Sequence, residues 1–259
     1  MSNKCIIFSV CALLFTTSFC VFAEKTFLVG ADLTNPPFQF RNKDGNPDGF
    51  EIELTNALCK SVNVMCIYVV NNFDAQIPAL IARKVDFILP LGVTPKRQKT
   101  IDFTDYVFHL PTRLVAKKDS NIMPQVKSLK DKIIAVQQGS IQEAYAEKYW
   151  RPAGVNIKNY QDPEAIYEDL VANRVDAALC PSVAVNYGFL KTHAGEDFEL
   201  KGPEVTDADL FSKGSAFGVR KGDYETKTLL NKGLDNIMRN TTFSNIQKKY
   251  FGDQDLKVK

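Results

Sequence analysis

The side chains best suited to chemistry in this sequence are those that could hold a small anion. Thr94 can cap a helix that begins at Pro95, and this places Arg97 in the first turn, beside backbone N–H groups that lack helical partners. A planar guanidinium next to such N–H groups suits a carboxylate. Ser140 and Ile141 begin a second predicted helix, whose amides have the same preference. We therefore expect these two loops to bind a small anion or zwitterion.

One acidic side chain follows the first predicted strand. Asp32 comes after the strand predicted at 26–30, at its carboxyl end, where a carboxylate can pair with a cationic group. The alternative is that Asp32 caps a turn, which is a common role of aspartate in loops. The residues alone leave both roles open.

Catalytic and metal-binding motifs are absent from the sequence. The two histidines, His109 and His193, have no second candidate ligand near them, so zinc sites and histidine-dependent triads have little support. There is no nucleophile elbow, P-loop or dinucleotide fingerprint. We expect no cofactor, no metal and no catalytic residue, and a protein that binds its ligand without converting it.

Composition is typical of a soluble globular protein. Of 259 residues, 45% are hydrophobic and 24% are charged, and the net charge of +2 gives no reason to expect a nucleic-acid partner. Residues 1–23 are typical of a signal peptide, since Lys4 precedes the apolar stretch 5–15 and small side chains stand at Val21 and Ala23. An uncleaved membrane anchor is the alternative. We expect cleavage after Ala23 and export of one large or two modest domains.

Three cysteines lie beyond the predicted signal. Cys59 lies near the end of a helical pattern and Cys66 begins an apolar run, so a helix–turn–strand corner could bring them within disulfide range. Two reduced core thiols are the alternative. Cys180 has no partner left, and we expect it to be buried and inert.

An internal repeat predicts two similar lobes. The segment 80–90 aligns with 170–180, and each predicts a helix end, a polar turn and a short buried strand. Chance similarity of two ordinary helix–strand units is the alternative. Strands also open each lobe, at 26–30 and 133–136, and strands alternating with helices predict parallel α/β sheets. Ligands of such sheets lie beyond the carboxyl ends of the strands.

Two extended apolar segments, 113–117 and 216–220, are predicted to cross between the lobes. They divide the chain into a discontinuous lobe 1, residues 24–111 plus 214–259, and a lobe 2, residues 112–213. Two antiparallel crossings would let the lobes rotate about a hinge while each stays folded.

The motif Gly49–Leu54, read as GFEIEL, resembles the signature of the bacterial periplasmic amino-acid-binding proteins, solute-binding protein family 3. The similarity continues through 35–38, 77–80, 94–98, 138–143 and 248–252, and is strongest to the histidine and lysine/arginine/ornithine-binding branch. This resemblance implies a two-lobe class II fold, a periplasmic location, an ABC permease as partner, and a monomer that binds no nucleic acid. It also implies a disulfide between Cys59 and Cys66.

The resemblance also assigns roles in the ligand site. Arg97 and the amides of Ser140 and Ile141 would bind the α-carboxylate, Asp32 would pair with a cationic side chain, and Phe73 would flank it. The full predicted set of ligand-binding residues is Asp32, Asn35, Phe73, Pro90, Gly92, Arg97, Gln137, Ser140, Ile141, Gln142 and Pro181.

The sequence departs from the family pattern at several of these positions. The loop Pro90-Leu91-Gly92 is shorter and lacks the family's hydroxyl groups, although Gly92 keeps a backbone N–H. Pro181 stands where relatives have an aspartate for the α-ammonium group. We expect either that Asp207 or Asp209 replaces this aspartate or that the ligand lacks a free α-amine. A buried ammonium without an acid would lose about 1.5 to 3 kcal/mol.

Our main hypothesis is a receptor that closes around a polar or cationic amino acid, or a derivative. One alternative is an enzyme on the same scaffold, similar to cyclohexadienyl dehydratases, with Asp32 as the acid. Others are a binding module for a carboxylate that is not an amino acid, and an exported adhesin or signalling module.

Overall fold

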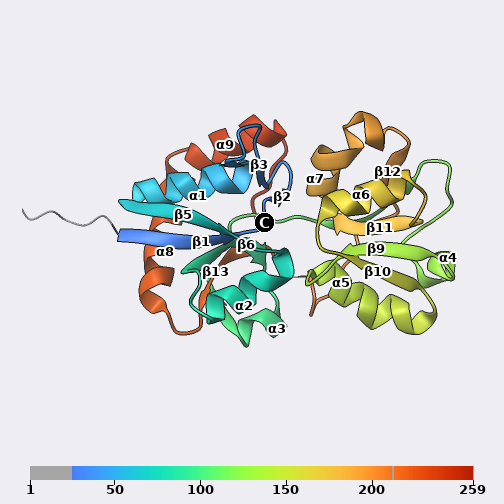
Figure 1. The fold of residues 1–259 in the computed structure, drawn as a ribbon, viewed down its shortest axis with the longest axis horizontal. Helices are drawn as coiled ribbons and strands as arrows, with labels where there is room; N and C mark the ends of the chain where they lie inside the picture. The colour runs from blue at the N-terminus through green and yellow to red at the C-terminus, as the bar shows by residue number, and fades with distance from the viewer. Residues whose placement is uncertain (1–24, 212, 259) are drawn as a thin grey trace, which may run out of the picture.

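Two α/β lobes lie side by side in the computed structural model, which describes residues 25–211 and 213–258 (Figure 1). Each lobe is built on a five-stranded sheet. The expected two-lobe α/β architecture is confirmed. The predicted signal peptide lies outside the described residues, and among those residues no helix is long and apolar enough to span a bilayer.

The sheet of lobe 1 has the strand order β5-β1-β6-β13-β7. Parallel pairing joins the first three strands, and β13 runs antiparallel to both of its neighbours. The strands are β1 (Lys25–Ala31), β5 (Val64–Val70), β6 (Phe87–Gly92), β7 (Ile101–Phe103) and β13 (Ser215–Arg220). The helices are α1 (Phe50–Ser61), η1 (Phe73–Ala75), α2 (Gln76–Ile81), α3 (Pro95–Gln98), α8 (Tyr224–Arg239) and α9 (Thr242–Phe251). A small antiparallel sheet contains β2 (Thr34–Asn35), β3 (Gln39–Arg41) and β4 (Pro47–Asp48).

The sheet of lobe 2 has the order β10-β9-β11-β8-β12, with the first three strands parallel and β8 antiparallel to its neighbours. Its strands are β8 (Thr112–Lys117), β9 (Ile133–Gln137), β10 (Asn156–Tyr160), β11 (Ala177–Pro181) and β12 (Phe198–Lys201). Its helical segments are α4 (Val126–Leu129), α5 (Ile141–Tyr145), η2 (Ala146–Trp150), η3 (Arg151–Ala153), α6 (Pro163–Val171), α7 (Ser182–Val185), η4 (Asn186–Leu190) and η5 (His193–Gly195). The two sheets thus share one pattern of neighbours.

The aligned repeat has a structural basis in two aspartates. Asp86 accepts a hydrogen bond from the backbone N–H of Leu28 and donates its own N–H to the carbonyl of Leu28, at 2.9 and 2.7 Å. In lobe 2, Asp176 makes the same pair of bonds with Ile133, at 2.8 Å each. Each aspartate therefore fixes the start of its strand against the strand that opens its lobe.

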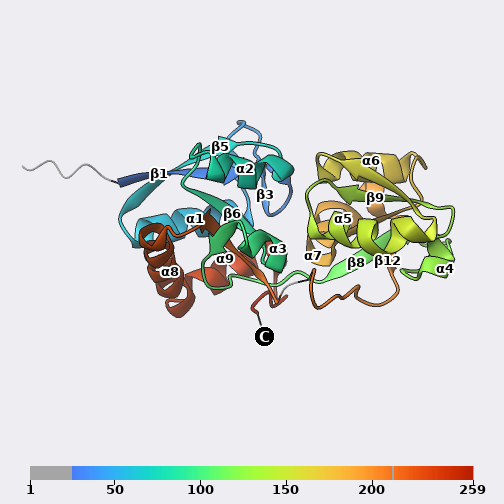
Figure 2. The same ribbon diagram turned by 90° about the horizontal axis from the view of Figure 1, so that it is seen from below.

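The two predicted crossover strands are present as β8 and β13, and each belongs to the sheet of the lobe that it enters. Just before them the two connecting segments run together. Ser215 donates its N–H to the carbonyl of Phe108 at 2.7 Å, and Val205 donates to Thr112 at 2.9 Å. Figure 2 shows these thin connections between the lobes. We propose that lobe 1 consists of residues 24–111 and 214–259 and that lobe 2 consists of residues 112–213.

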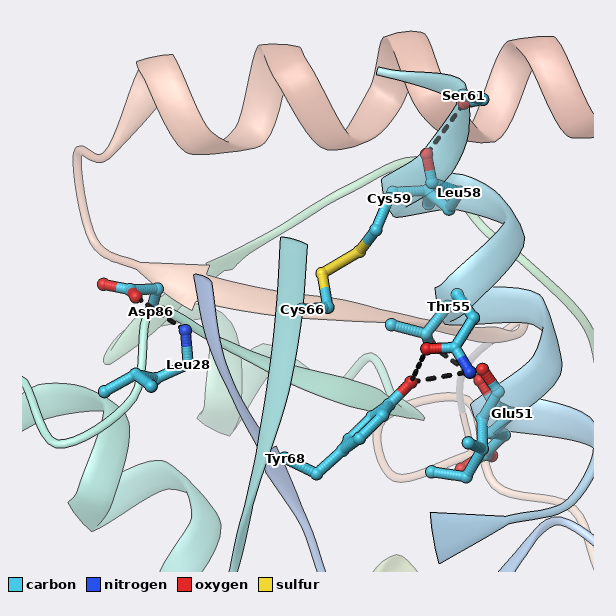
Figure 3. The surroundings of a disulfide bond; sticks show 11 residues. Leu28, Glu51, Thr55, Leu58, Cys59, Ser61, Cys66, Tyr68 and Asp86 are labelled. Atoms are coloured by element: carbon cyan, nitrogen blue, oxygen red, sulfur yellow. Dashed lines mark hydrogen bonds between the residues drawn. A yellow bond between two sulfur atoms is a disulfide. The ribbon is translucent and has the colours of Figure 1, made fainter. Parts of the chain in front are cut away.

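The predicted disulfide is confirmed. Cys59 ends the buried face of α1 and Cys66 lies in β5, with 6.3 Å between their Cα atoms (Figure 3). A second tie joins the same elements, because the Tyr68 hydroxyl donates to the carbonyl of Ile52 at 3.1 Å. Cys180 is a buried free thiol, as expected, and burial raises its pKa to about 12, so it stays protonated.

Candidate functional site

A cavity of about 100 Å³ lies between the lobes. It forms where loops after the strands of both sheets meet, which is the position expected for ligands of α/β sheets. All eleven residues predicted to bind the ligand line it. Six residues that the sequence did not indicate line it as well: Gln39, Glu51, Leu91, Phe108, Leu110 and Ser215. Larger cavities exist on the described surface, and one of about 700 Å³ also contains Arg97, Ser140 and Ile141, but the cavity of about 100 Å³ is lined by the whole predicted set.

Arg97 is held at the lobe boundary by its own helix start. The Thr94 hydroxyl accepts from the N–H of Arg97 at 3.1 Å, so Thr94 caps α3 as its sequence predicts. The guanidinium donates to the carbonyl of Gly92 at 2.8 Å and, across the boundary, to that of Gly139 in lobe 2 at 3.0 Å. Three of its five N–H groups remain for a ligand. Burial lowers the pKa of Arg97 to about 10, so it is charged at neutral pH.

The start of α5 forms the lobe 2 side of the anion site. The Ser140 hydroxyl caps the helix by accepting from the N–H of Glu143 at 3.0 Å, and the Glu143 carboxylate accepts from the N–H of Gly139 at 2.7 Å. The N–H of Ser140 donates to the carbonyl of Gln137 at 3.2 Å in this structure, and its role toward a ligand stays a prediction. The amides of the first helical turn, beginning at Ile141, are those that a capped helix leaves for a ligand.

Asp32 lies at the carboxyl end of β1 with 6% of its surface exposed. Asp32 has the turn-capping role, because its carboxylate accepts from the N–H of Thr34 at 3.2 Å, and it also lines the cavity, where pairing with a cationic group stays a prediction. Burial raises the pKa of Asp32 to about 6, and the charge of Asp162 adds to the rise. Hydrogen bonds from Thr34 and Gln137 offset part of it. A cationic ligand group beside Asp32 would favour its ionised form.

Behind Asp32 lie two buried residues that the sequence analysis missed. Gln39 accepts from the N–H of Asp32 at 3.0 Å and donates to the Glu51 carboxylate at 2.8 Å. Burial, followed by the nearby charge of Asp32, raises the pKa of Glu51 well above its usual value. Glu51 accepts the hydrogen bond that positions Gln39, which in turn positions Asp32. Figure 3 shows Glu51 on α1, one turn before Thr55.

A second, smaller void of about 10 Å³ shares Asp32, Gln39, Phe73, Pro90 and Leu91 with the cavity. Gln76 of α2 also lines this void and is 5% exposed. Its amide nitrogen donates to the carbonyl of Asn71 at 2.9 Å, but its Oε1 atom has no hydrogen-bond partner among the described residues. A buried acceptor without a donor is unfavourable by about 1 to 3 kcal/mol.

The family's acid for an α-ammonium group has no replacement in the cavity. Pro181 lines the wall, as predicted, but neither Asp207 nor Asp209 does. Asp207 instead accepts from the amides of Asp209 and Leu210 at 3.0 and 2.8 Å, and its interaction with Tyr149 lowers its pKa. Neither aspartate lines the cavity, and the other expectation, a ligand without a free α-amine, stays a prediction.

Further polar contacts cross from lobe to lobe. Gln138 donates to the carboxylate of Asp74 at 2.7 Å, and Asn72 donates to the side chain of Gln161 at 2.8 Å. Gly139 approaches Asp74 so closely that a Cβ atom there would lie 2.8 Å from the Asp74 Cβ. Together with the Arg97 contact, these bonds hold the lobes in a closed arrangement.

The described residues contain no group of three or more histidine, cysteine, aspartate or glutamate side chains placed to hold a metal ion. The predicted wall residues Asn35 and Gln142 line the cavity, and Gln142 donates its side-chain N–H to the hydroxyl of Thr112 at 2.8 Å. The charged residues that line the cavity are therefore one cation, Arg97, and two acids, Asp32 and Glu51, together with the half-buried ring of Phe73.

Comparison with known proteins agrees with this geometry. The family model of bacterial extracellular solute-binding proteins, family 3, matches residues 27–253. The histidine-binding periplasmic protein of Escherichia coli (strain K12) is 41% identical over 242 residues, which cover 92% of this chain and 93% of that protein. The lysine/arginine/ornithine-binding periplasmic protein of the same strain is 42% identical over 228 residues, 88% of each chain.

Among solved structures, an ancestral arginine-binding protein bound to arginine superposes with a TM-score of 0.80 at 30% identity, covering 88% of this chain and 99% of that one. The family match extends over both lobes and the relatives exceed 40% identity over nearly their whole length. The protein described here is therefore a member of the bacterial extracellular solute-binding proteins, family 3.

Proposed function

We propose that this protein is the solute receptor of an ABC importer and captures a polar or cationic amino acid, or a close derivative, between its lobes. The observation that carries the proposal is the shared cavity, in which Arg97 and Asp32 face the ligand space around Phe73. One fixed cation and one ionisable acid match the charges of a ligand with a carboxylate and a positive group. Relatives named for binding histidine or lysine, arginine and ornithine support this choice.

Each wall has a role in this proposal. Arg97 and the first amides of α5 bind the carboxylate, and Asp32 pairs with the cationic group. Phe73 supports the ligand chain; its ring centroid lies 5.6 Å from the Arg97 guanidinium, and a ligand cation over the same ring would gain about 0.5 to 2 kcal/mol. Asn35, Gln137 and Gln142 add neutral polar contacts.

Capture requires movement of the lobes. A cavity of about 100 Å³ is smaller than the roughly 300 to 1,000 Å³ of typical ligand sites. We therefore infer that the lobes separate about the two connecting segments to admit the ligand and close again through the contacts of Arg97, Asp74 and Asn72 with lobe 2. The closed lobes then present one composite surface to the permease, and the receptor acts as a monomer in the periplasm after cleavage behind Ala23.

Calorimetry tests the proposal directly. The full chain is stripped of ligand in urea, because guanidinium would compete for a cation site, and is refolded. It is then titrated with arginine, lysine, ornithine, histidine and glutamine. We expect heat with at least one of them and loss of that heat in Arg97→Ala, but not in the control Arg239→Ala, whose side chain in α8 is 80% exposed. Absence of heat with every amino acid and derivative tested would refute the proposal.

A second candidate follows from the raised pKa of Asp32. An acid with a pKa of about 6 keeps part of its protonated form near neutral pH, which a lyase that protonates a leaving group needs. Incubation with prephenate and arogenate distinguishes this candidate from a receptor, because only an enzyme forms an aromatic product. Our proposal of binding without turnover predicts no product.

A further inference from the structure

The charges that line the cavity are unequally distributed. Of the described residues in its lining, Asp32 and Glu51 are the acids and Arg97 is the cation. Both acids belong to lobe 1 and are joined through Gln39. Around the carboxylate-binding end, the lining consists of the neutral groups Gly92, Leu110, Ser140, Ile141, Gln142 and Pro181. None of these lining residues is an acid; Glu143, whose carboxylate accepts from the N–H of Gly139 at 2.7 Å, lines a neighbouring cavity instead.

The end of the cavity beside Asp32 has an excess of hydrogen-bond acceptors. The void beside Asp32 is lined by Asp32 and by Gln76, a residue buried to 95% whose Oε1 atom lies beside Gly30 and has no hydrogen-bond partner among the described residues. Two acceptors around one void, one of them without any donor, match a group that brings several N–H donors and a positive charge. Phe73 lines both the void and the main cavity, so it connects this end with the Arg97 end.

Resting on the proposed function, we infer that the ligand is a carboxylic acid with one distal ammonium or guanidinium group, which Asp32 and Gln76 bind, and that an α-amine is not required. Gln76 is the specificity residue that this assignment adds. A ligand with an α-ammonium must leave that charge against neutral groups, whereas its analogue without the amine loses nothing there.

The test uses matched ligand pairs on the unmodified full chain. Calorimetry compares L-arginine with 5-guanidinopentanoic acid, and L-lysine with 6-aminohexanoic acid. Each analogue differs from its parent only by the missing α-amine. We expect the dissociation constant of each analogue to be lower than that of its parent, or at most about threefold higher. Agmatine, which keeps the guanidinium but lacks the carboxylate, is expected to bind at least about tenfold more weakly because Arg97 has no anion to hold.

Variants test the two ends separately. Gln76→Met removes the unpaired acceptor and keeps the chain length, and it should weaken binding of both guanidino ligands about tenfold, while Gln125→Met, on exposed lobe 2 surface, should not. Pro181→Asp should create a preference of about tenfold for L-arginine over its analogue. Circular dichroism confirms that each variant is folded.

The outcomes separate this inference from the function on which it rests. Binding of L-arginine with an analogue more than about thirtyfold weaker would overturn the inference and leave the receptor intact. Unchanged affinity in a folded Gln76→Met variant would overturn the role of Gln76. Absence of binding by parents and analogues, and by ornithine, histidine and glutamine as well, would refute the proposed function itself.

Discussion

Proton release on binding is the sharpest consequence of the buried position of Asp32. In the unliganded protein the pKa of Asp32 is about 6, so roughly nine in ten side chains are ionised at pH 7 and roughly one in ten at pH 5. A ligand cation binds the ionised form. The affinity for arginine should therefore fall about tenfold from pH 7 to pH 5, although arginine itself does not change charge in this range.

The variant Asp32→Asn separates this dependence from that of the neighbouring groups. Arg97 has a pKa of about 10 and stays charged across the range, and burial raises the pKa of Glu51 well above its usual value. The charge of Asp162 is already part of the rise at Asp32. The sign is also fixed for folding: an acid whose pKa is raised in the folded state stabilises the unliganded protein below pH 4, and this contribution is lost as the pH rises through 6.

Calorimetry in buffers of different ionisation enthalpy measures both effects at once. We expect about 0.9 proton released per arginine at pH 5 and about 0.1 at pH 7. Asp32→Asn should bind arginine more weakly at pH 7 and show neither the slope nor the released proton. A flat affinity profile in the natural chain, or a slope that survives in Asp32→Asn, would show that Asp32 does not bind the cation.

Three further predictions concern binding and stability. Arg97→Ala should lose about 100-fold or more in affinity, because at least two charge-assisted bonds to the carboxylate disappear, while Arg97→Lys should recover only part of it in the same titration. Replacing Cys59 and Cys66 together by alanine should lower the free energy of unfolding by about 2 to 3 kcal/mol in urea, and an unchanged midpoint would contradict the tie between α1 and β5. Asp86→Ala should lower it by about 1 to 2 kcal/mol, since the N–H of Leu28 loses its acceptor, and equal stability would show that the repeat's aspartate is dispensable.

Local sequence signals predicted the fold because each element carries its own boundary markers. Thr94 and Ser140 cap the helices that their positions indicate, and the repeated aspartates mark equivalent strand starts in both lobes. The proximity of Cys59 and Cys66 could be predicted for the same reason, because a helix end is followed closely by a strand.

The missed part of the site depends on contacts between distant segments. Gln39, Glu51 and Gln76 lie in a short strand and two helices of lobe 1, and each reads as an ordinary polar residue of its element. Their burial arises only when these elements pack together around Asp32. One signal for a buried acid was available in the sequence: Glu51, the third residue of GFEIEL, stands between the apolar residues Phe50 and Ile52 at the start of the helix.

Cysteine pairing in this chain is biased by distance along the backbone. In an unfolded chain that contains Cys59, Cys66 and Cys180, the native partners are 7 residues apart, whereas either alternative pairing with Cys180 would close a loop of more than 100 residues. The entropy of loop closure favours the short loop by about 2.5 kcal/mol, or roughly 60-fold. Oxidation of the unfolded chain would thus already favour the native bond between Cys59 and Cys66. Cys180 would then stop taking part in thiol–disulfide exchange once folding buries it in the core.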